Sequence, residues 1–317
     1  MAEIGAFLSS EEHGACSLVR QAKMAEAAKM RGLFISDHYH PWIDAQGESP
    51  FVWGVIGAIS AATSLPVTTG VTCPTVRIHP AVVAQAAATA QSLLKGRFVF
   101  GVGSGEALNE HIVGDPWPPA TTRLEMLEEA VGVIRELWKG GVVTHYGKHY
   151  TVENARLYSL PDEPPPIAVS AFGPMAAEVA ARIGDGFVTV QPDKEILDHY
   201  RKHGGIGPSI AALKVCWDHD EARARKLAHQ LWPTEALEGQ LSQELPMPSH
   251  FEAAAAHVTE DMVADVVSCG PDPERHVQAI SRYLEAGFDR VFINQIGPEQ
   301  EGFFAFYRNE LAPRLGV

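Results

Sequence analysis

Residues 66–102 read PVTTGVTCPTVRIHPAVVAQAAATAQSLLKGRFVFGV, and this stretch decides the fold. Two short runs rich in β-branched or aromatic residues, 66–71 and 97–102, flank a longer run, 81–94, whose apolar residues recur at helical spacing. A strand, a helix and a second strand in this order are typical of a parallel sheet covered by helices. The stretch therefore predicts an α/β protein.

The same alternation extends along the chain in both directions. We expect strands at 4–8, 32–36, 66–71, 97–102, 167–171, 186–190, 211–217 and 290–295. We expect helices at 18–30, 51–62, 81–94, 123–138, 174–183, 194–202, 221–231 and 272–286, and a closing helix from about 301 to 311. Eight alternations in 317 residues favour a closed (β/α)8 TIM barrel over an open doubly wound sheet, which usually has fewer strands. No linker or shift in composition marks a second domain, so we expect a single domain spanning 1–317.

Three segments do not fit the simple repeat. Residues 103–122 form a Gly-, Pro- and acid-rich connection after the fourth strand, and residues 233–270 form a long insertion after the seventh. Residues 142–152 predict a hairpin that turns at Gly147 and Lys148, followed by a Pro-rich bridge. Loops that follow barrel strands gather at the C-terminal rim, so the first two segments are candidates for building a substrate pocket.

Composition excludes several classes of partner. With 25 Lys and Arg against 39 Asp and Glu, the formal net charge is −14, which disfavours nucleic acid and anionic membrane surfaces. The apolar runs are too short to cross a bilayer, and the N-terminus lacks the pattern of a secretory signal, so we expect a cytoplasmic protein. The four cysteines are scattered without a CxxC pair, which indicates reduced thiols.

The first candidate for chemistry is SDHYHPW, residues 36–42, at the end of the second strand. Three interpretations compete. His38 and His40 alternate like the paired histidines of barrel metallohydrolases, but among the later strand ends only His219 is available as a further histidine ligand. Alternatively His38, beside Asp37, accepts a proton, or it merely ends a strand. We expect no metal.

Two further candidates follow the fourth and fifth strands. GVGSGEALNE, residues 101–110, lacks the GxGxxG spacing of a dinucleotide fingerprint, which disfavours a Rossmann NAD site. Its glycines allow a flat ligand close to the backbone, although a Gly-rich strand end with surface acids is also common. SAFGP, residues 170–174, ends in a Pro that begins a helix, and free N–H groups there suit a phosphate.

Taken together, SDHYHPW, TTGVT followed by CPTVRIHPAVVAQAAAT, GVGSGEALNE and VSAFGP resemble the bacterial luciferase-like superfamily, in the branch that depends on the deazaflavin coenzyme F420. The likeness is greatest to the F420-dependent glucose-6-phosphate dehydrogenase group. The resemblance implies a (β/α)8 barrel with insertions, a homodimer, and an oxidoreductase that transfers a hydride between the deazaflavin C5 and an alcohol or carbonyl substrate.

The resemblance also implies roles for individual residues. His38 matches the catalytic histidine, Glu106 the carboxylate that protonates the coenzyme ring, and Trp42 the aromatic residue at the reacting centre. The peptide bond between Gly70 and Val71 matches a cis bond behind the ring. The coenzyme-binding positions are Asp37, Gly70, Val71, Ser104, Gly105 and Asn109 around the ring, with Ser170, Ala171, Gly173 and Pro174 near its phosphate.

One departure from the group concerns the substrate. Sugar-phosphate dehydrogenases of this group hold their substrate phosphate with two lysines and an arginine, whereas here no lysine follows Lys226 and only Lys194 lies near one of those positions. The segment GPEQEG, residues 297–302, is acidic where the arginine is expected. We therefore expect a small, neutral, partly apolar substrate rather than glucose 6-phosphate. An F420-dependent sugar-6-phosphate dehydrogenase and an FMN-dependent luciferase-like monooxygenase are the alternatives.

Overall fold

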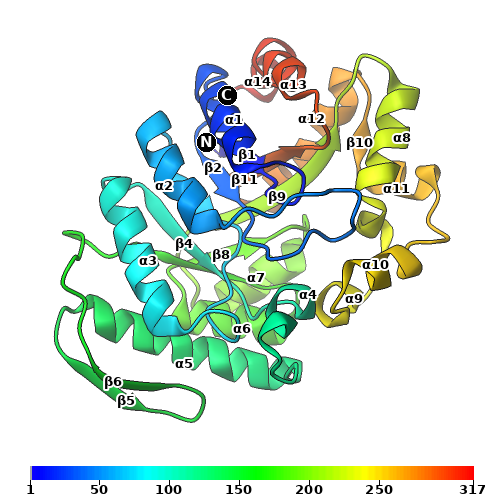
Figure 1. Ribbon diagram of the computed structural model, residues 1–317. Coiled ribbons are helices and arrows are strands. Elements are labelled where there is room, and N and C mark those ends of the chain that lie inside the picture. The colour runs from blue at the N-terminus through cyan, green and yellow to red at the C-terminus, as the bar shows by residue number, and fades with distance from the viewer. Residues whose placement is uncertain (1) are drawn as a thin grey trace.

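The computed structural model describes residues 2–317 and shows a closed parallel barrel ringed by helices (Figure 1). The strands follow one another around the barrel in chain order, and β8 pairs with β9 to keep the ring closed. They are β1 (Glu3–Leu8), β2 (Leu33–Ile35), β3 (Val67–Thr69), β4 (Phe98–Val102), β7 (Ile167–Ser170), β8 (Gly186–Thr189), β9 (Ser209–Cys216) and β11 (Arg290–Gln295). The predicted (β/α)8 barrel is confirmed.

The helices alternate with these strands and cover the outside of the barrel. They are α1 (Ala15–Ala27), α2 (Val52–Ala62), α3 (Pro80–Leu93), α5 (Ala120–Trp138), α6 (Pro174–Ile183), α7 (Lys194–Lys202), α8 (Glu221–Leu231) and α12 (Pro273–Ala286). The chain closes with α13 (Gln300–Phe306), a π-helical turn η3 (Tyr307–Leu311) and α14 (Ala312–Leu315). Predicted boundaries shift by a few residues, as where α1 begins at Ala15 instead of Leu18.

Strand alternation sorts side chains between two cores. In β1, Ile4, Ala6 and Leu8 point outward into the large cluster between strands and helices, whereas Phe7 points into the barrel. The interior holds the rings of Phe34 and Phe292, whose centroids lie 5.4 Å apart. The barrel is therefore a packed core, and chemistry is confined to its rim.

The segments predicted outside the repeat take their expected places. After β4 come α4 (Ala107–Glu110) and η1 (His111–Val113); after α8 come η2 (Pro233–Ala236), α9 (Leu241–Glu244), α10 (Pro248–Ala254), α11 (Glu260–Val266) and the unpredicted short strand β10 (Ser268–Cys269). The hairpin forms between β5 (Val143–Tyr146) and β6 (Thr151–Ala155). Contacts between α4 and α9 bring the two insertions together over one end of the barrel (Figure 1).

Candidate active site

Loops at the C-terminal ends of β1, β2 and β4 bring a histidine between two glutamates. Nε2 of His38 lies 3.4 Å from Oε1 of Glu11 and 3.6 Å from Oε2 of Glu106. The His38 side chain is 10% exposed and that of Glu106 is 31% exposed, so the pair opens to the barrel mouth. The structure thus brings together two predicted residues, and it adds Glu11, which the sequence analysis missed.

The pKa values of the two glutamates are shifted in opposite directions. Burial favours the neutral form of Glu11, but the charge of His38 and hydroxyl donors, Ser36 at 2.6 Å and Ser9 at 2.9 Å, hold its pKa below the usual 4.5. Burial raises the pKa of Glu106, with His38 opposing and the charge of Glu11 adding to the rise. Glu11 is therefore the carboxylate of the cluster, and Glu106 is the acid that keeps its proton to higher pH.

Asn109 connects the two loops that carry His38 and Glu106. Its Oδ1 accepts the backbone N–H groups of Tyr39 at 2.8 Å and His40 at 3.2 Å. Its Nδ2 donates to Glu106 Oε2 at 3.1 Å and lies 3.2 Å from Nδ1 of His38. Nδ1 of His38 also lies 3.1 Å from the carbonyl oxygen of His40. A carbonyl can only accept, so we assign the proton of the neutral ring to Nδ1, which leaves the lone pair of Nε2 between the two glutamates. Asn109 is 4% exposed and contacts both side chains, so it fixes the spacing of His38 and Glu106.

Asp37 points away from His38 into a buried ion-pair network. It accepts from Thr72 Oγ1 at 2.7 Å and from a guanidinium nitrogen of Arg77 at 2.9 Å. Arg77 also donates its backbone N–H to Glu110 at 2.6 Å. Arg77 and Glu110 were not predicted; the only signals for them were one Arg in the loop after β3 and one of the three acids within residues 103–122. The network fastens the loop after β3 to the loops after β2 and β4.

Trp42 forms one wall of the site. Its ring centroid lies 5.2 Å from that of His38 and 5.1 Å from that of Phe251 in α10. An apolar cluster surrounds these rings, made of Ile43, Leu108 and Phe251 with Leu237 and Leu245 packed against it. Phe303 and Phe304 of α13 do not join this cluster, because both are buried in the core between strands and helices.

His40 does not join His38 in a paired site. Its Nδ1 bonds the carbonyl of Leu108 at 2.9 Å, and its ring stacks on His111 with centroids 5.6 Å apart. Within residues 2–317, the one group of three His, Cys, Asp or Glu side chains with metal-like spacing lies elsewhere, at Glu178, His199 and His203. The geometry therefore gives the paired-histidine metal hypothesis no support.

Backbone features next to the mouth match those expected for a flat ring. The Gly70–Val71 peptide bond is cis. At Gly103 an added Cβ would lie 2.7 Å from Cγ2 of Val71, and Gly105 has φ +91°, a conformation that favours glycine. Ser104 stands between the two glycines. Replacing Gly103 or Gly105 would press a side chain against the adjoining loop and narrow the mouth of the barrel.

The corner between β7 and α6 leaves room for an anion. Gly173 is the N-cap of α6, no side chain caps the first turn, and Pro174 occupies its first position. A Cβ on Gly173 would meet nothing within 4 Å, so the space before the helix is open. Ser170 and Ala171 lead into this corner. Uncapped N–H groups at the positive end of a helix suit a phosphate.

Lys214 is a cation near the site that the sequence analysis did not single out. It lies on β9, pairs with Glu235 Oε1 at 2.8 Å and sits 4.1 Å from the ring centroid of Trp232. Its charge acts against the burial that raises the pKa of both Glu12 and Glu106. Lys214 is thus present beside the mouth but already neutralised by a carboxylate.

None of the helices in residues 2–317 combines the length and apolar composition needed to cross a membrane.

Comparison with known proteins agrees with this geometry. A family model described as luciferase-like monooxygenase matches residues 1–290. The F420-dependent glucose-6-phosphate dehydrogenase of Microbacterium testaceum is 34% identical over 97% of this chain and 95% of its own. The protein of the same name from Nakamurella multipartita is 35% identical over 97% and 94%.

Solved structures give the same result. An F420-dependent secondary alcohol dehydrogenase in complex with an F420–acetone adduct superposes with a TM-score of 0.90 at 28% identity, covering 99% of each chain. A coenzyme F420-dependent tetrahydromethanopterin reductase from Methanopyrus kandleri, at 21% identity and a TM-score of 0.80, supports the fold.

The barrel and its rim therefore define a TIM-barrel enzyme with a histidine and two glutamates at its mouth. The chain belongs to the luciferase-like family, and its curated relatives carry F420-dependent names, as the sequence motifs predict.

Proposed function

We propose that this protein is an F420-dependent oxidoreductase that interconverts a neutral secondary alcohol and its ketone. The observation that carries the proposal is His38 between Glu11, whose pKa is lowered, and Glu106, whose pKa is raised, at the mouth of a barrel whose relatives carry F420-dependent names. When bound, the deazaflavin supplies the hydride acceptor.

The coenzyme fits the residues present. Gly103 and Gly105 leave the backbone accessible beside Glu106, and Gly70, Val71, Ser104 and Asn109 complete that wall. The uncapped corner at Ser170, Ala171, Gly173 and Pro174 would hold the phosphate. Asp37, whose carboxylate is engaged by Thr72 and Arg77, would support the ring through the loop it anchors.

His38, Glu11 and Glu106 have different roles in the proposed proton transfers. His38 takes the alcohol proton at Nε2, and the Glu11 carboxylate at 3.4 Å stabilises the resulting imidazolium. Glu106, whose pKa is raised by burial, would act as the general acid toward the coenzyme ring. Trp42 and the apolar cluster behind it exclude water and orient the substrate carbon.

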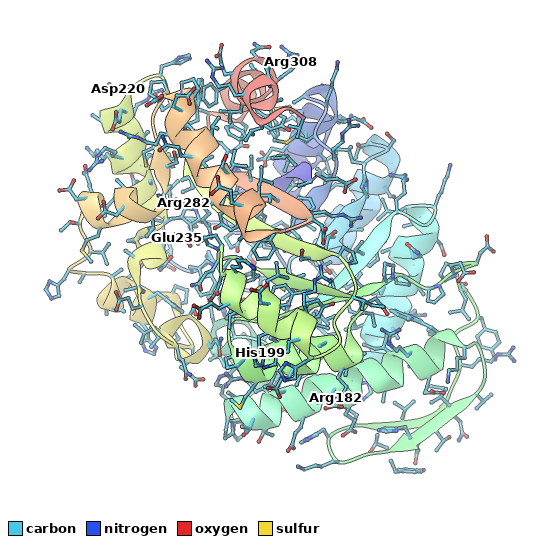
Figure 2. All side chains as sticks on the ribbon, turned by 180° about the vertical axis from the view of Figure 1, so that it is seen from behind. Arg182, His199, Asp220, Glu235, Arg282 and Arg308 are labelled. Atoms are coloured by element: carbon cyan, nitrogen blue, oxygen red, sulfur yellow. The ribbon has the colours of Figure 1, made fainter. Side chains whose placement is uncertain are left out.

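The charges around the mouth favour a neutral substrate. Lys214 is paired with Glu235, and Lys194 lies exposed on α7 bound to Asp198 at 2.7 Å. Figure 2 shows Arg282 on the outer face of α12 and Arg308 at the surface of the C-terminal turns. The two lysines are engaged by carboxylates and the two arginines are exposed on the outside of the barrel, so none of these four groups is available to a phosphate ester at the mouth. Lost charge-assisted hydrogen bonds are worth roughly 1.5–3 kcal/mol each.

Calorimetry of the purified protein with F420, FMN and NADPH tests the coenzyme. We expect tight binding of F420 alone. Tight NADPH or FMN binding with none of F420 would contradict the proposal, and FMN binding would instead favour the monooxygenase alternative.

We further propose that the chain is one domain that works as a cytoplasmic homodimer. The resemblance to the luciferase-like superfamily supports this assembly. Light scattering coupled to gel filtration measures the assembly, and a monomer at micromolar concentration would contradict it.

A further inference from the structure

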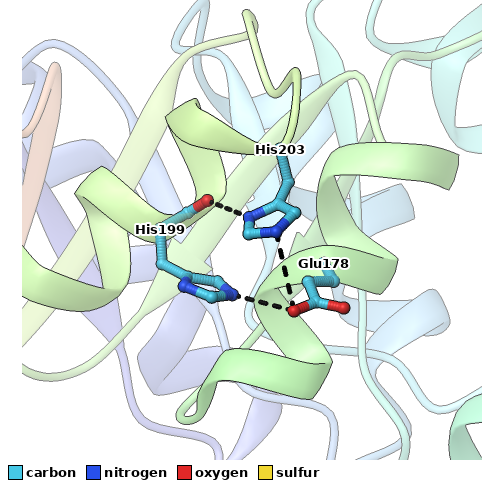
Figure 3. Close-up of side chains that lie close together, drawn as sticks. All are labelled: Glu178, His199 and His203. Carbon is cyan, nitrogen blue, oxygen red and sulfur yellow. Dashed lines mark hydrogen bonds and ion pairs between the residues drawn. The ribbon is translucent and has the colours of Figure 1, made fainter.

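A cluster of two histidines and a glutamate lies on the outer helices α6 and α7 (Figure 3). His199 is in the last turn of α7, and His203 follows four residues later as its C-cap. Residues four apart on a helix share a face, so the two rings lie together, with centroids 4.2 Å apart. Glu178 faces them from the neighbouring helix α6.

The ligand atoms converge on one point. Glu178 Oε1 lies 3.0 Å from Nε2 of His199 and 3.7 Å from Nε2 of His203, and all three atoms are within 4.8 Å of one another. Two ligands of a tetrahedral Zn²⁺ ion are about 3.3 Å apart, given bond lengths of about 2.0–2.1 Å. Side-chain rotations alone can close the difference.

The hydrogen-bonding pattern leaves two acceptors, Nε2 of His203 and the Glu178 carboxylate, facing each other. Nδ1 of His203 lies 2.9 Å from the carbonyl oxygen of His199, so in the neutral ring Nδ1 carries the proton and donates it there. Nε2 then presents a lone pair to the Glu178 carboxylate. Two acceptors that face each other are relieved by a cation between them, either a proton on Nε2 or a metal ion. A backbone carbonyl that orients a histidine in this way is the usual outer contact of a metal ligand.

The neighbouring cationic side chains do not supply a positive charge to this cluster. Arg182, one turn along α6, is held by Glu128 through two hydrogen bonds of 2.8 and 2.7 Å. Arg201 on α7 bonds the carbonyl of Gly207 at 2.6 Å, and Lys194 bonds Asp198. These cations are engaged with other partners, so none of them bridges the cluster.

We propose that Glu178, His199 and His203 form a binding site for a divalent transition-metal ion of the Zn²⁺ class. Imidazole nitrogens and one carboxylate suit Zn²⁺, Ni²⁺ and Cu²⁺, whereas Mg²⁺ and Ca²⁺ prefer more oxygen ligands. The three side chains are 29–46% exposed, so water completes the coordination. The ion joins α6 to α7, and its site is independent of the proposed coenzyme.

The test uses full-length protein without a histidine tag, stripped with EDTA and dialysed. Zn²⁺ is titrated by calorimetry into wild type, Glu178→Gln and the double variant His199→Asn/His203→Asn. His257→Asn, which removes another exposed histidine, is the matched control. We expect one Zn²⁺ per wild-type and control chain, and an affinity at least about tenfold weaker in the two cluster variants.

A second readout separates the site from His38, which also lies near two carboxylates. Saturating Zn²⁺ should raise the Tm of wild type and of His257→Asn, and leave that of the double variant unchanged. Mg²⁺ should raise neither. Equal Zn²⁺ affinity and stoichiometry in wild type and the double variant would overturn the proposal, as would a wild type that binds no Zn²⁺ at 100-fold excess over protein.

Discussion

Nε2 of His38 lies 3.6 Å from Oε2 of Glu106, although 68 positions separate the two residues in the chain. Asn109 contacts both side chains, and Glu11 faces the same nitrogen of His38 from a third loop. The barrel makes this possible because every strand delivers its following loop to the same rim. The barrel thereby brings together, at its mouth, the two side chains that we propose as base and acid.

Removing either member of the pair should slow hydride transfer and leave coenzyme binding nearly intact. We expect His38→Ala and Glu106→Gln each to lose about 10²–10⁴-fold in rate, the usual contribution of a general acid or base. F420 affinity should stay within about tenfold. Stopped-flow reduction of the coenzyme by a secondary alcohol measures the rate, and His111→Ala, whose ring stacks on His40 and not on His38, is the control. A variant with near wild-type turnover would lose its assigned role.

The acid role of Glu106 predicts the direction of a pH effect. Because burial raises its pKa, Glu106 keeps its proton above the usual range of a glutamate and loses it as the pH rises further. Single-turnover coenzyme reduction should therefore fall as pH increases through that pKa. Glu106→Gln should react more slowly, and its rate should no longer decrease as the pH rises. An unchanged pH profile in the variant would assign the titration to another group.

Sequence patterns predicted the barrel because its determinants are local and repeated. Each βα unit carries its own apolar periodicity, as residues 66–102 show, and eight such units leave one closed arrangement. The strand β10 escaped prediction because it has two residues and pairs only through the neighbouring β9. The cis bond at Gly70 was expected from family resemblance, since no propensity indicates it.

The site was only partly predictable. His38 and Glu106 stand in motifs at strand ends, but Glu11 lies in SSEEH, which reads as a polar surface turn. Its burial depends on Ser36, which is 25 positions away. In the same way, Lys214 could be counted from the sequence, yet its neutralisation by Glu235 is a property of the folded insertion.

Two adjacent residues, Glu12 and His13, should make the free energy of unfolding depend on pH in opposite directions. Burial raises the pKa of Glu12 from 4.5 to about 7, although Trp232 and Gly297 donate hydrogen bonds to it. Its contribution to stability is complete below pH 4.5 and is lost as pH rises to 7. Burial lowers the pKa of His13 from 6.5 to about 4, so its contribution is complete above pH 6.5 and is lost as pH falls to 4.

The two pH dependences of the free energy of unfolding nearly cancel in the wild type. Removing one of the two residues should therefore reveal the dependence that the other one causes. At about 1.4 kcal/mol per pKa unit, each is worth at most about 3 kcal/mol. In Glu12→Gln the free energy of unfolding should rise with pH between 4 and 6.5, and in His13→Asn it should fall between 4.5 and 7. Urea unfolding at pH 5, 6 and 7 measures both, and slopes of the same sign in the two variants would refute the assignment.

The last prediction concerns substrate charge and rests on the pair between Lys214 and Glu235. In the wild type we expect a higher kcat/KM for isopropanol or cyclohexanol than for glucose 6-phosphate, because Glu235 already neutralises Lys214. Glu235→Gln frees the ammonium, so the ratio of kcat/KM for the sugar phosphate to that for cyclohexanol should increase about tenfold or more, the worth of one charge-assisted hydrogen bond. Asp198→Asn is the matched control, because it frees Lys194 on the exposed face of α7 and should leave the ratio unchanged. A wild type that prefers glucose 6-phosphate to every neutral alcohol would show that phosphate is held by groups other than Lys214, and an unchanged ratio in Glu235→Gln would show that the freed ammonium does not reach the substrate.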